Sequence, residues 1–470
     1  MKRDTAELLE LIRAGRPMSI WQRMRLTVLL SIPAIMANLS SIVMQYIDAA
    51  MVGSLGAGAA ASIGLVSTTT WLFGGLCGAA ATGFSVQAAH RIGANDMEGA
   101  RSVLKQSLCA VAAFAILLGA IGVGISGALP HWLGGDESIR PAASEYFRIY
   151  AFSIPALQMV FLSAGMLRCS GNMKVPSILS VAMCALDVVF NYLLIFVAGL
   201  GVAGAALGTA ASEIVVGLVM LWYLLSRSET LSLRGHPGRW RISRLTLRRA
   251  TGIGLPIGLE HAMICGAQIA TTVIVAPLGV AAIAANAFGV IAESLCYMPG
   301  YGISEAATTL TGQSLGAGRR RLTRSFANIS VLMGMCVMGV TGVLMYLFAP
   351  EIIGVLSPVE EIRRLGSEAL RIEAFAEPMY AASLVAYGAF VGAADTVIPC
   401  LMNVASIWGV RITLAIWLAP SMGLQGVWLA MCIELCFRGS IFLCRLVWGN
   451  WMKNVKKESI NYETDKGPQV

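Results

Sequence analysis

The chain has 470 residues, of which 57% are hydrophobic and 13% are charged, and this composition excludes a water-soluble globular protein. It is typical of a helical protein that crosses a membrane many times, with no stretch polar enough to form a separate soluble domain. The net charge of +8 would favour nucleic-acid binding in a soluble protein, but here Lys and Arg sort by loop, which indicates membrane topology and no nucleic-acid partner.

The first 25 residues are polar, basic and helix-prone. They contain no short apolar core followed by a small-residue cleavage site, so we expect no cleavable signal peptide.

The eleven cysteines are scattered through apolar stretches without a C-x-x-C pair. They are therefore predicted to be buried hydrophobic residues, with neither a disulfide framework nor a zinc site.

Apolar runs that are long enough to cross a bilayer follow one another along the rest of the chain. They lie near residues 26–52, 59–87, 106–128, 146–168, 175–197, 202–225, 250–275, 281–310, 326–349, 371–393, 396–419 and 424–447. The predicted fold is an all-α membrane protein with twelve transmembrane helices.

The basic residues predict the orientation of these helices. With the amino terminus in the cytoplasm, the cytoplasmic segments hold 27 Lys and Arg and the opposite side holds five, so both termini are expected to be cytoplasmic in a cell (inner) membrane. The linker at 227–249 carries seven arginines and marks the midpoint. It joins an amino-terminal lobe at 26–226 to a carboxyl-terminal lobe at 250–447, which is followed by a tail at 448–470.

The two halves repeat each other at a shift of 223 residues. Pro33 then falls on Pro256, and the pattern R-I-x-A-F-x-x-P occurs at 148–155 and again at 371–378. Six helices in each half give the halves the same orientation, so two pseudo-symmetric six-helix bundles are predicted. This is the architecture of a carrier with alternating access. Pro33 and Pro256 each interrupt a helix backbone and are the predicted hinges.

A few polar groups inside the spans are candidates for function. Asp48 lies on the first span, where an aspartate costs about 2.5–3.5 kcal/mol on insertion scales. Asp187 and Asn191 lie one turn apart on the fifth. Two carboxylates in a low dielectric repel, so one of them holds a proton or the pair shares a cation such as Na⁺. The alternative is that Asp48 caps a helix end. The repeat partner of Asp48 is Thr271, which favours ion coupling in the amino-terminal half.

Three glutamates are candidates for binding a cationic substrate. Glu260 and Glu293 lie well inside the seventh and eighth spans, with an interhelical hydrogen bond or ion pair as the alternative. Glu377 shares a face with Glu373 at the outer start of the tenth span, where the pair lines a vestibule or lies in solvent.

Glu434 and Arg438 are one turn apart on the last span and are predicted to neutralise each other. Arg411 lies in the eleventh span, and its ion-pair partner cannot be identified from the sequence. We expect neither a cofactor nor a resident metal.

Several stretches resemble the multidrug and toxic compound extrusion (MATE) family, and the likeness covers about residues 20 to 451. They include IDAAMVGSLGAGAAASIG at 47–64, MPGYGISEAATTLTGQSLGAGRRR at 298–321 and GAADTVIP at 392–399. The resemblance implies a twelve-helix, two-lobe antiporter that exports organic cations in exchange for H⁺ or Na⁺.

The resemblance also implies roles for particular residues. Asp48 occupies the aspartate of the family pattern D-x-x-x-V/L-G on helix 1. Asp187 and Asn191 occupy the helix-5 pair, with the amide and acidic types interchanged. The helix-7 glutamate of one branch corresponds here to Ile264, and Glu260 lies one helical turn earlier.

The leading hypothesis is therefore a monomeric antiporter that exports small organic cations through the lipid membrane by alternating access, with Asp48, Asp187 and Asn191 coupling the ion. A flippase for lipid-linked oligosaccharides or polymers is the alternative, for which an arginine-lined cavity is expected, whereas the intramembrane charges here are mainly acidic. A membrane-embedded enzyme is a distant third, because H-E-x-x-H, G-x-S-x-G and P-loop patterns do not occur.

Overall fold

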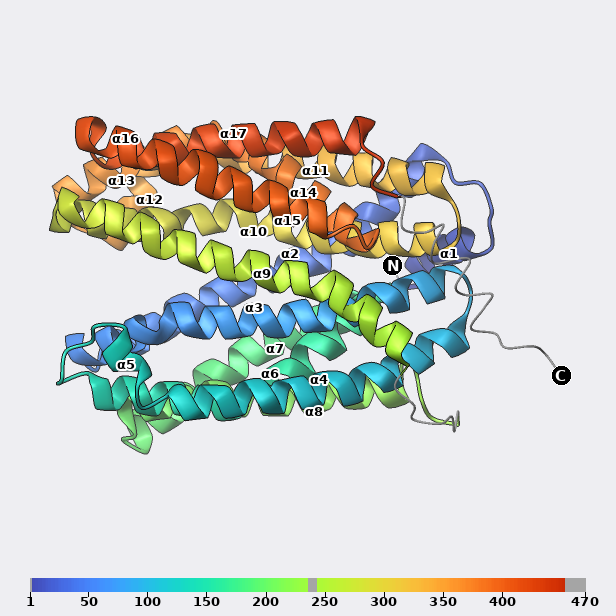
Figure 1. Ribbon diagram of the computed structural model, residues 1–470, viewed down its shortest axis with the longest axis horizontal. Helices are drawn as coiled ribbons and strands as arrows, with labels where there is room; N and C mark the ends of the chain where they lie inside the picture. The colour runs from blue at the N-terminus through green and yellow to red at the C-terminus, as the bar shows by residue number, and fades with distance from the viewer. Residues whose placement is uncertain (1, 236–242, 453–470) are drawn as a thin grey trace. The chain divides into compact units, whose positions relative to one another are not determined.

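A computed structural model describes residues 2–235 and 243–452, and throughout this part of the chain the regular elements are helices, without a strand (Figure 1). The elements are α1 (Lys2–Arg13), α2 (Ile20–Gly53), α3 (Ala57–Gly93), α4 (Met97–Ile125), α5 (Leu129–Trp132), α6 (Arg140–Cys169), α7 (Lys174–Tyr192), η1 (Leu193–Val197), α8 (Gly201–Ser226), α9 (Arg244–Val275), η2 (Ala276–Leu278), α10 (Val280–Gly316), α11 (Arg320–Leu347), α12 (Ala349–Leu356), α13 (Glu360–Glu373), α14 (Glu377–Gly392), α15 (Val397–Ser406), η3 (Ile407–Ile412), α16 (Thr413–Met422) and α17 (Leu424–Trp448).

The described helices include eleven that are long and apolar enough to cross a membrane, and α13 with α14 form one further pair that passes the same test together. Counting that pair as one span gives twelve, so the all-α prediction with twelve spans is confirmed. Each apolar run forms a helix because a helix satisfies its backbone hydrogen bonds internally, as the interior of a bilayer requires.

The tenth span differs from the prediction of one helix at 371–393. It consists of α13 and α14, which are bent by 60° at residues 374–376. Pro378 lies in the first turn of α14. Proline lacks an N–H and disfavours helical geometry in the residue before it, so the helix breaks just upstream. The pair of glutamates expected to share one helical face, Glu373 and Glu377, therefore flanks this bend.

The fifth and eleventh spans, which are repeat equivalents, each contain a π-helical segment. The segment η1 continues α7, and η3 lies between α15 and α16. A π-helical turn inserts one extra residue and redirects the side chains near it, which is why such turns are frequent at functional sites. Asn191 lies two residues before η1, and Arg411 lies within η3.

The chain divides into two compact units whose boundaries fall inside helices. Residues 36–261 form the first, here called the N unit, and residues 1–35 with 262–470 form the second, the C unit. The boundaries therefore lie within α2 and α9, whereas the sequence analysis placed them in the loops before these helices. Pro33 and Pro256 each lie within a few residues of a boundary, where the backbone lacks one hydrogen bond. Their role as hinges stays a prediction.

The N unit is organised around α6, which packs against α3, α4 and α8. Helices α3 and α9 approach each other closely through small residues. A Cβ added to Gly83 would lie 2.4 Å from the carbonyl oxygen of Ala250, and one added to Gly254 would lie 2.8 Å from that of Ala79. Glycine at this crossing lets the two backbones meet, which is the usual way in which membrane helices gain packing energy.

The C unit is organised around α10 and α14. Helix α10 packs against α11 and α14, and α14 also packs against α17. Its core includes an aromatic cluster in which the Phe390 ring lies 5.9 Å from the Phe442 ring and 5.4 Å from the Trp451 ring, between centroids. Asp395 forms an ion pair with Arg445 beside this cluster.

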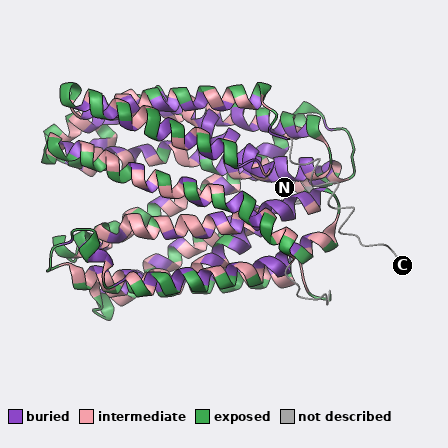
Figure 2. Cartoon of the chain, in the orientation of Figure 1, coloured by how far each residue is buried: buried purple, intermediate pink, exposed green. Residues whose placement is uncertain are grey.

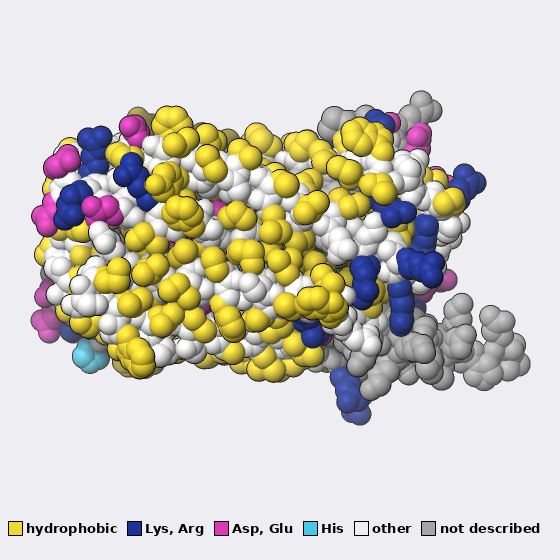
Figure 3. Space-filling view, turned by 90° about the horizontal axis from the view of Figure 1, so that it is seen from above, with side chains coloured by type: hydrophobic (Ala, Val, Ile, Leu, Met, Phe, Trp, Pro, Cys, Tyr) yellow, Lys and Arg dark blue, Asp and Glu magenta, His cyan; other side chains and the backbone are white. Residues whose placement is uncertain are grey.

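The exposed parts of the helices are largely apolar. Figure 2 shows exposed and buried residues alternating along the long helices, and exposed residues such as Ile116, Val189 and Leu218 are large and hydrophobic. On the face shown in Figure 3, hydrophobic side chains cover the middle of the helices and charged side chains gather at their ends. This distribution fits helices that are surrounded by lipid over their central length.

Candidate functional site

The N unit brings Asp48, Asp187 and Asn191 together. Asn191 Nδ2 donates hydrogen bonds to Asp48 Oδ1 at 2.9 Å and to Asp187 Oδ2 at 3.1 Å. Asp187 and Asn191 are buried, with 0% and 1% of their surface exposed, while Asp48 is partly exposed. The two carboxyl groups are also hydrogen-bond neighbours of each other. One amide therefore joins two carboxyl groups that come from α2 and α7.

Helix α8 completes the surroundings of Asp187. Ser212 Oγ lies 3.3 Å from Asp187 Oδ1, and Thr209 also donates to this carboxyl group. Gly208, one residue earlier, leaves the space that the Asn191 amide occupies, since an added Cβ would lie 2.0 Å from Asn191 Oδ1. The buried carboxyl group is thus held by donors from α7 and α8, so its position is fixed.

No basic group balances these acids. Across residues 2–235 and 243–452, neither Asp48 nor Asp187 forms an ion pair with Lys, Arg or His. Two adjacent carboxylates without a counter-charge cannot both stay ionised in a low dielectric. The arrangement therefore has the chemistry to take up one proton or one small cation. The described residues contain no group of three or more His, Cys, Asp or Glu placed to hold a metal ion.

Glu213 is another buried acid of the N unit, which sequence reasoning did not place at the site. It follows Ser212 on α8, is 7% exposed, and has one carboxylate oxygen, Oε2, without a hydrogen-bond partner among the described residues. Ser153 of α6 lies beside the carboxyl group, although its hydroxyl donates to the Tyr150 carbonyl oxygen. The sequence did contain a signal for Glu213, because it is an acid in the middle of a predicted span, and such acids are rare and face the interior of the bundle.

Adding a methyl group at Gly208 tests whether the position of Asn191 matters. We expect Gly208→Ala to displace the Asn191 amide and lower gradient-driven transport about tenfold, since the connection between the two carboxyl groups is lost. Gly124→Ala is the matched control, because a Cβ there meets no atom within 4 Å. Transport assays on both variants at equal protein levels make the comparison, and equal rates would show that the Asn191 position is unimportant.

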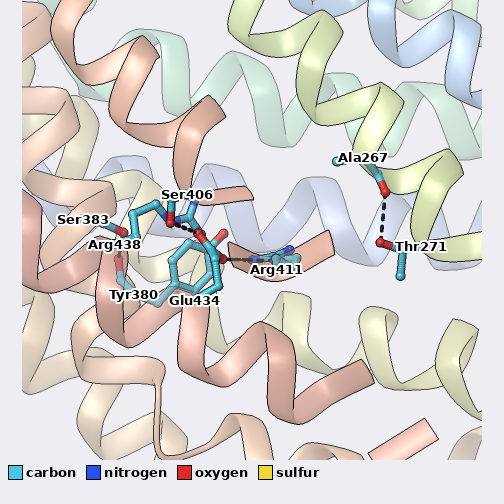
Figure 4. Close-up of polar contacts among 8 residues, drawn as sticks. All are labelled: Ala267, Thr271, Tyr380, Ser383, Ser406, Arg411, Glu434 and Arg438. Carbon is cyan, nitrogen blue, oxygen red and sulfur yellow. Dashed lines mark hydrogen bonds and ion pairs between the residues drawn. The ribbon is translucent and has the colours of Figure 1, made fainter. Parts of the chain in front are cut away.

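The C unit contains a buried ion-pair network centred on Glu434 (Figure 4). Arg411 donates from Nη2 at 2.6 Å and from Nε at 3.0 Å to Glu434 Oε2, and Ser406 Oγ donates to Oε1 at 2.6 Å. Arg438 Nε lies 3.1 Å from Oε1, which confirms the predicted Glu434–Arg438 pair. The Arg438 guanidinium also lies 5.5 Å from the centre of the Tyr380 ring. Both arginines are therefore engaged by one carboxylate.

Three further acids are buried in the same unit. Glu293 is 6% exposed, and Glu373 and Glu377 are fully buried, so the alternative that the last two lie in solvent was wrong. The burial of Glu377 follows from packing against Gly342 of α11. A Cβ added to Gly342 would be 3.0 Å from the Cβ of Glu377. Glu373 has no hydrogen-bond partner on either carboxylate oxygen among the described residues. Glu293, Glu373, Glu377 and Glu434 are thus all buried in the unit that holds Arg411 and Arg438.

Glu260 belongs to the other unit. The predicted carboxyl-terminal lobe at 250–447 includes Glu260 together with Glu293, whereas the N unit extends to His261 and therefore contains Glu260. Glu260 is 5% exposed. The neighbouring His261 packs on Gly75 of α3, where a Cβ would lie 1.9 Å from the imidazole ring. The end of the N unit inside α9 therefore carries Glu260, while Glu293 lies in the C unit.

The two units differ chemically at equivalent places in the repeat. In the C unit, Thr271 stands where the N unit has Asp48, and its hydroxyl bonds the Ala267 carbonyl oxygen at 2.9 Å (Figure 4). Thr271 and Arg411 line a cavity of about 90 Å³ in that unit. A resident guanidinium thus neutralises acid in the C unit, while Asp48 and Asp187 of the N unit form no ion pair with a basic residue among the described residues. A repeated membrane fold with unpaired acids inside one repeat is the class of the secondary transporters.

Comparison with known proteins agrees with this class. The MatE family model matches residues 33–193 and again residues 256–417, which together make up more than half of the chain. The chain belongs to the MATE family of transporters, and it is not an enzyme. The two matched segments begin 223 residues apart, at Pro33 and Pro256, which is the shift found in the sequence repeat.

Relatives of similar length carry the name multidrug resistance protein. The chain is 25% identical to the probable multidrug resistance protein NorM of Thermotoga maritima over 433 residues, covering 90% of this chain and 92% of that one. It is 22% identical to the multidrug resistance protein MdtK of Yersinia pestis, with 89% and 94% covered.

Solved structures share the fold at 21% identity and a TM-score of 0.86. A MATE in complex with MaL6 covers 96% of this chain and 99% of its own, and a MOP superfamily transporter from Pyrococcus furiosus, described as having a binding pocket of reverse polarity, covers 95% and 98%.

Proposed function

We propose that this protein exports organic cations by alternating access in exchange for H⁺ or Na⁺, and that Asp48, Asp187 and Asn191 form the ion-coupling site. The observation that carries the proposal is the pair of carboxyl groups bridged by Asn191 without a basic partner among the described residues. The names of the relatives, which are multidrug resistance proteins, support drug-like cargo.

Coupling follows from competition between like charges. An H⁺ or Na⁺ bound to the carboxyl pair removes the negative charge that would attract an organic cation, so loading the ion weakens binding of the cargo and releases it. The ion is discharged after the carrier turns to the other side. Thermodynamic linkage requires the reverse effect to be equally large, so the cargo must weaken ion binding by the same factor.

Movement of the carrier requires the helices shared by both units to deform. Pro33 and Pro256 are the proposed hinges, because each lies close to the point inside α2 or α9 where one compact unit ends. A MATE solved in a straight conformation and one solved in a bent conformation both match this chain, with TM-scores of 0.87 and 0.84. These two solved structures support a family fold that adopts more than one conformation.

Transport in vesicles under imposed gradients tests the proposal. We expect export of a fluorescent cation to follow a pH or Na⁺ gradient in the wild type, and Asp48→Asn to lower the gradient-driven rate at least tenfold, because the neutral amide neither binds the ion nor attracts the cargo. Glu137→Gln is the control, since its side chain is 91% exposed outside the described spans. Export by Asp48→Asn that still follows the gradient at the wild-type rate would refute the coupling site.

The acids of the C unit are proposed to attract the cationic cargo. Glu293 and Glu377 were predicted for this role, and the buried Glu373 without a hydrogen-bond partner adds a third. We expect Glu377→Gln to raise the KM for cationic cargo several-fold and to leave the gradient dependence intact, because this acid is in a different unit from the coupling site. Glu351→Gln at an exposed position of α12 is the control, and an unchanged KM in Glu377→Gln would contradict the role.

A flippase for anionic lipid-linked substrates would need free arginines within the spans. Arg411 and Arg438 both contact Glu434, which supports the cation exporter over the flippase. The excess of Lys and Arg on one side supports an inner-membrane orientation with both termini in the cytoplasm.

A further inference from the structure

A large basic cavity lies at one end of the C unit, away from the acids inside the spans. It has a volume of about 790 Å³ and is formed by the start of α2, the first turns of α11 and the end of α17. Its lining includes Arg23, Arg320, Arg321 and Arg324. A neighbouring cavity of about 510 Å³ shares three of these arginines and adds Arg319. Figure 3 shows many Lys and Arg side chains gathered at one end of the helices.

The charges around this cavity are not balanced by the lining residues, none of which is Asp or Glu. Arg23 is held in place by the Met18 carbonyl oxygen and by Ser325 Oγ, at 2.7 Å and 2.8 Å. Within residues 2–235 and 243–452, Arg320, Arg321 and Arg324 are exposed and form neither an ion pair nor a side-chain hydrogen bond. Three guanidinium groups are therefore available to a ligand.

The backbone adds to the positive potential. The three arginines lie in the first turns of α11, a helix of 28 residues whose N-cap, Arg319, makes no side-chain capping bond. The first N–H groups of a helix have no partner within the helix, and its dipole favours an anion at this end. Ser325 and Asn328, which also line the cavity, supply neutral hydrogen-bond donors. Together these groups suit a phosphate group, for which arginine offers bidentate geometry.

The rest of the cavity wall is apolar, which distinguishes the expected ligand from a free ion. Ile20 is 67% exposed and Trp448 is 80% exposed, and both line the cavity together with Ile329 and Met452. Exposed tryptophan at the end of a membrane helix is typical of the interface between lipid and water. A volume of about 790 Å³ is in the range of sites for organic ligands and far exceeds the needs of one inorganic ion.

We propose that this cavity binds the headgroup of an anionic phospholipid, with the phosphate against Arg320, Arg321 and Arg324 and the acyl chains along Ile20 and Trp448. Basic pockets at the ends of membrane helices are suited to such headgroups, since one membrane leaflet is itself anionic. A lipid bound here ties the start of α2 to α11 and α17 within the C unit. The proposal does not depend on which ion or cargo is transported.

The test measures lipid binding to the purified full chain in detergent. The probe is phosphatidylglycerol with a fluorophore on one acyl chain, titrated into wild type, Arg320→Gln/Arg321→Gln/Arg324→Gln and the matched control Arg227→Gln/Arg244→Gln/Arg248→Gln. The control removes the same charge from exposed positions of the N unit. We expect the first triple variant to bind roughly 100-fold more weakly, since each arginine near an anionic lipid contributes about fivefold, and the control to bind like the wild type. Equal binding by both variants would overturn the proposal.

Further arms identify the source of the phosphate group. Phosphatidylcholine, glycerol phosphate and inorganic phosphate should displace the probe poorly, and Trp448→Gln should weaken phosphatidylglycerol binding. Displacement by inorganic phosphate as effective as by unlabelled phosphatidylglycerol would overturn the lipid assignment in favour of a phosphate-ion site.

The residues after Met452 include three acids, Glu458, Glu463 and Asp465. If the lipid binds only to a chain that ends at Met452, the tail occupies the cavity in the whole protein and the proposal is wrong.

An independent readout separates binding from folding. The melting temperature of the arginine triple variant without added lipid should equal that of the wild type, because these side chains make no ion pair within the described residues. Added phosphatidylglycerol should raise the melting temperature of the wild type and the control, and leave that of the triple variant unchanged. An equal rise in all three proteins would overturn the proposal.

Discussion

Asp187→Asn is expected to lower gradient-driven export by about 100-fold, the upper end of the usual coupling range. Asp187 is fully buried, and Asn191, Ser212 and Thr209 all donate to its carboxyl group. An amide in place of the carboxylate cannot carry the negative charge that binds the ion. Its NH₂ group is itself a donor and would face the side chains that donate to Asp187. The measurement is export in vesicles with pH and Na⁺ gradients imposed separately.

The control for this experiment is Ser212→Ala, which removes one donor to Asp187 and keeps the charge. Its export should fall less than tenfold and still follow the gradient, because the charge of Asp187 is kept and the hydrogen bond that is lost is a long one of 3.3 Å. If Asp187→Asn retained coupled export while Ser212→Ala behaved as expected, the buried acid would have a structural role only, and the proposed coupling site would reduce to Asp48.

Glu434→Ala is expected to cause the largest loss of stability. The substitution leaves Arg438 buried and Arg411 partly buried without the counter-charge of Glu434, and breaking a buried ion pair in this way costs about 3–5 kcal/mol. For a unit of this size such a change lowers the apparent melting temperature by about 6–10 °C. Thermal unfolding in detergent measures the effect.

A compensated variant distinguishes charge imbalance from lost packing. Replacing Glu434, Arg411 and Arg438 together by Met removes the whole network, and buried ion pairs can be replaced by apolar residues at little cost. We expect this triple variant to melt closer to the wild type than Glu434→Ala does. Glu360→Gln, with a side chain that is 87% exposed, is the neutral control. A triple variant less stable than Glu434→Ala would mean that the network itself stabilises the C unit.

The number of spans and the repeat could be predicted from the sequence because they depend on local composition. A run of about 20 apolar residues forms a membrane helix almost regardless of its neighbours, so the length signal is strong. The octet at 148–155 and 371–378 marks the repeat, whose register agrees with the two segments matched by the family model. The bend between α13 and α14 was missed, although Pro378 was visible in the sequence.

The site could be predicted only in part. Asp48, Asp187 and Asn191 were grouped correctly because acids and amides inside spans stand out in an apolar sequence. Glu213 was not placed with them, since its neighbourhood depends on how α8 packs on α6. The place of Glu260 in the N unit was not foreseen either, because the unit boundary falls in the middle of α9 and no loop marks it. Tertiary packing decides both cases, and local sequence does not encode it.

The most direct test of the central claim is whether cargo and coupling ion compete for the carboxyl pair. Binding of a fluorescent organic cation to the purified protein is measured across pH and Na⁺ concentration, together with the release of H⁺ or Na⁺ when cargo is added. We predict that the ion weakens cargo binding, that cargo releases the ion by the same factor, and that Asp48→Asn and Asp187→Asn abolish both effects. Cargo binding that is unaffected by either ion, or ion release that persists in both variants, would contradict the account.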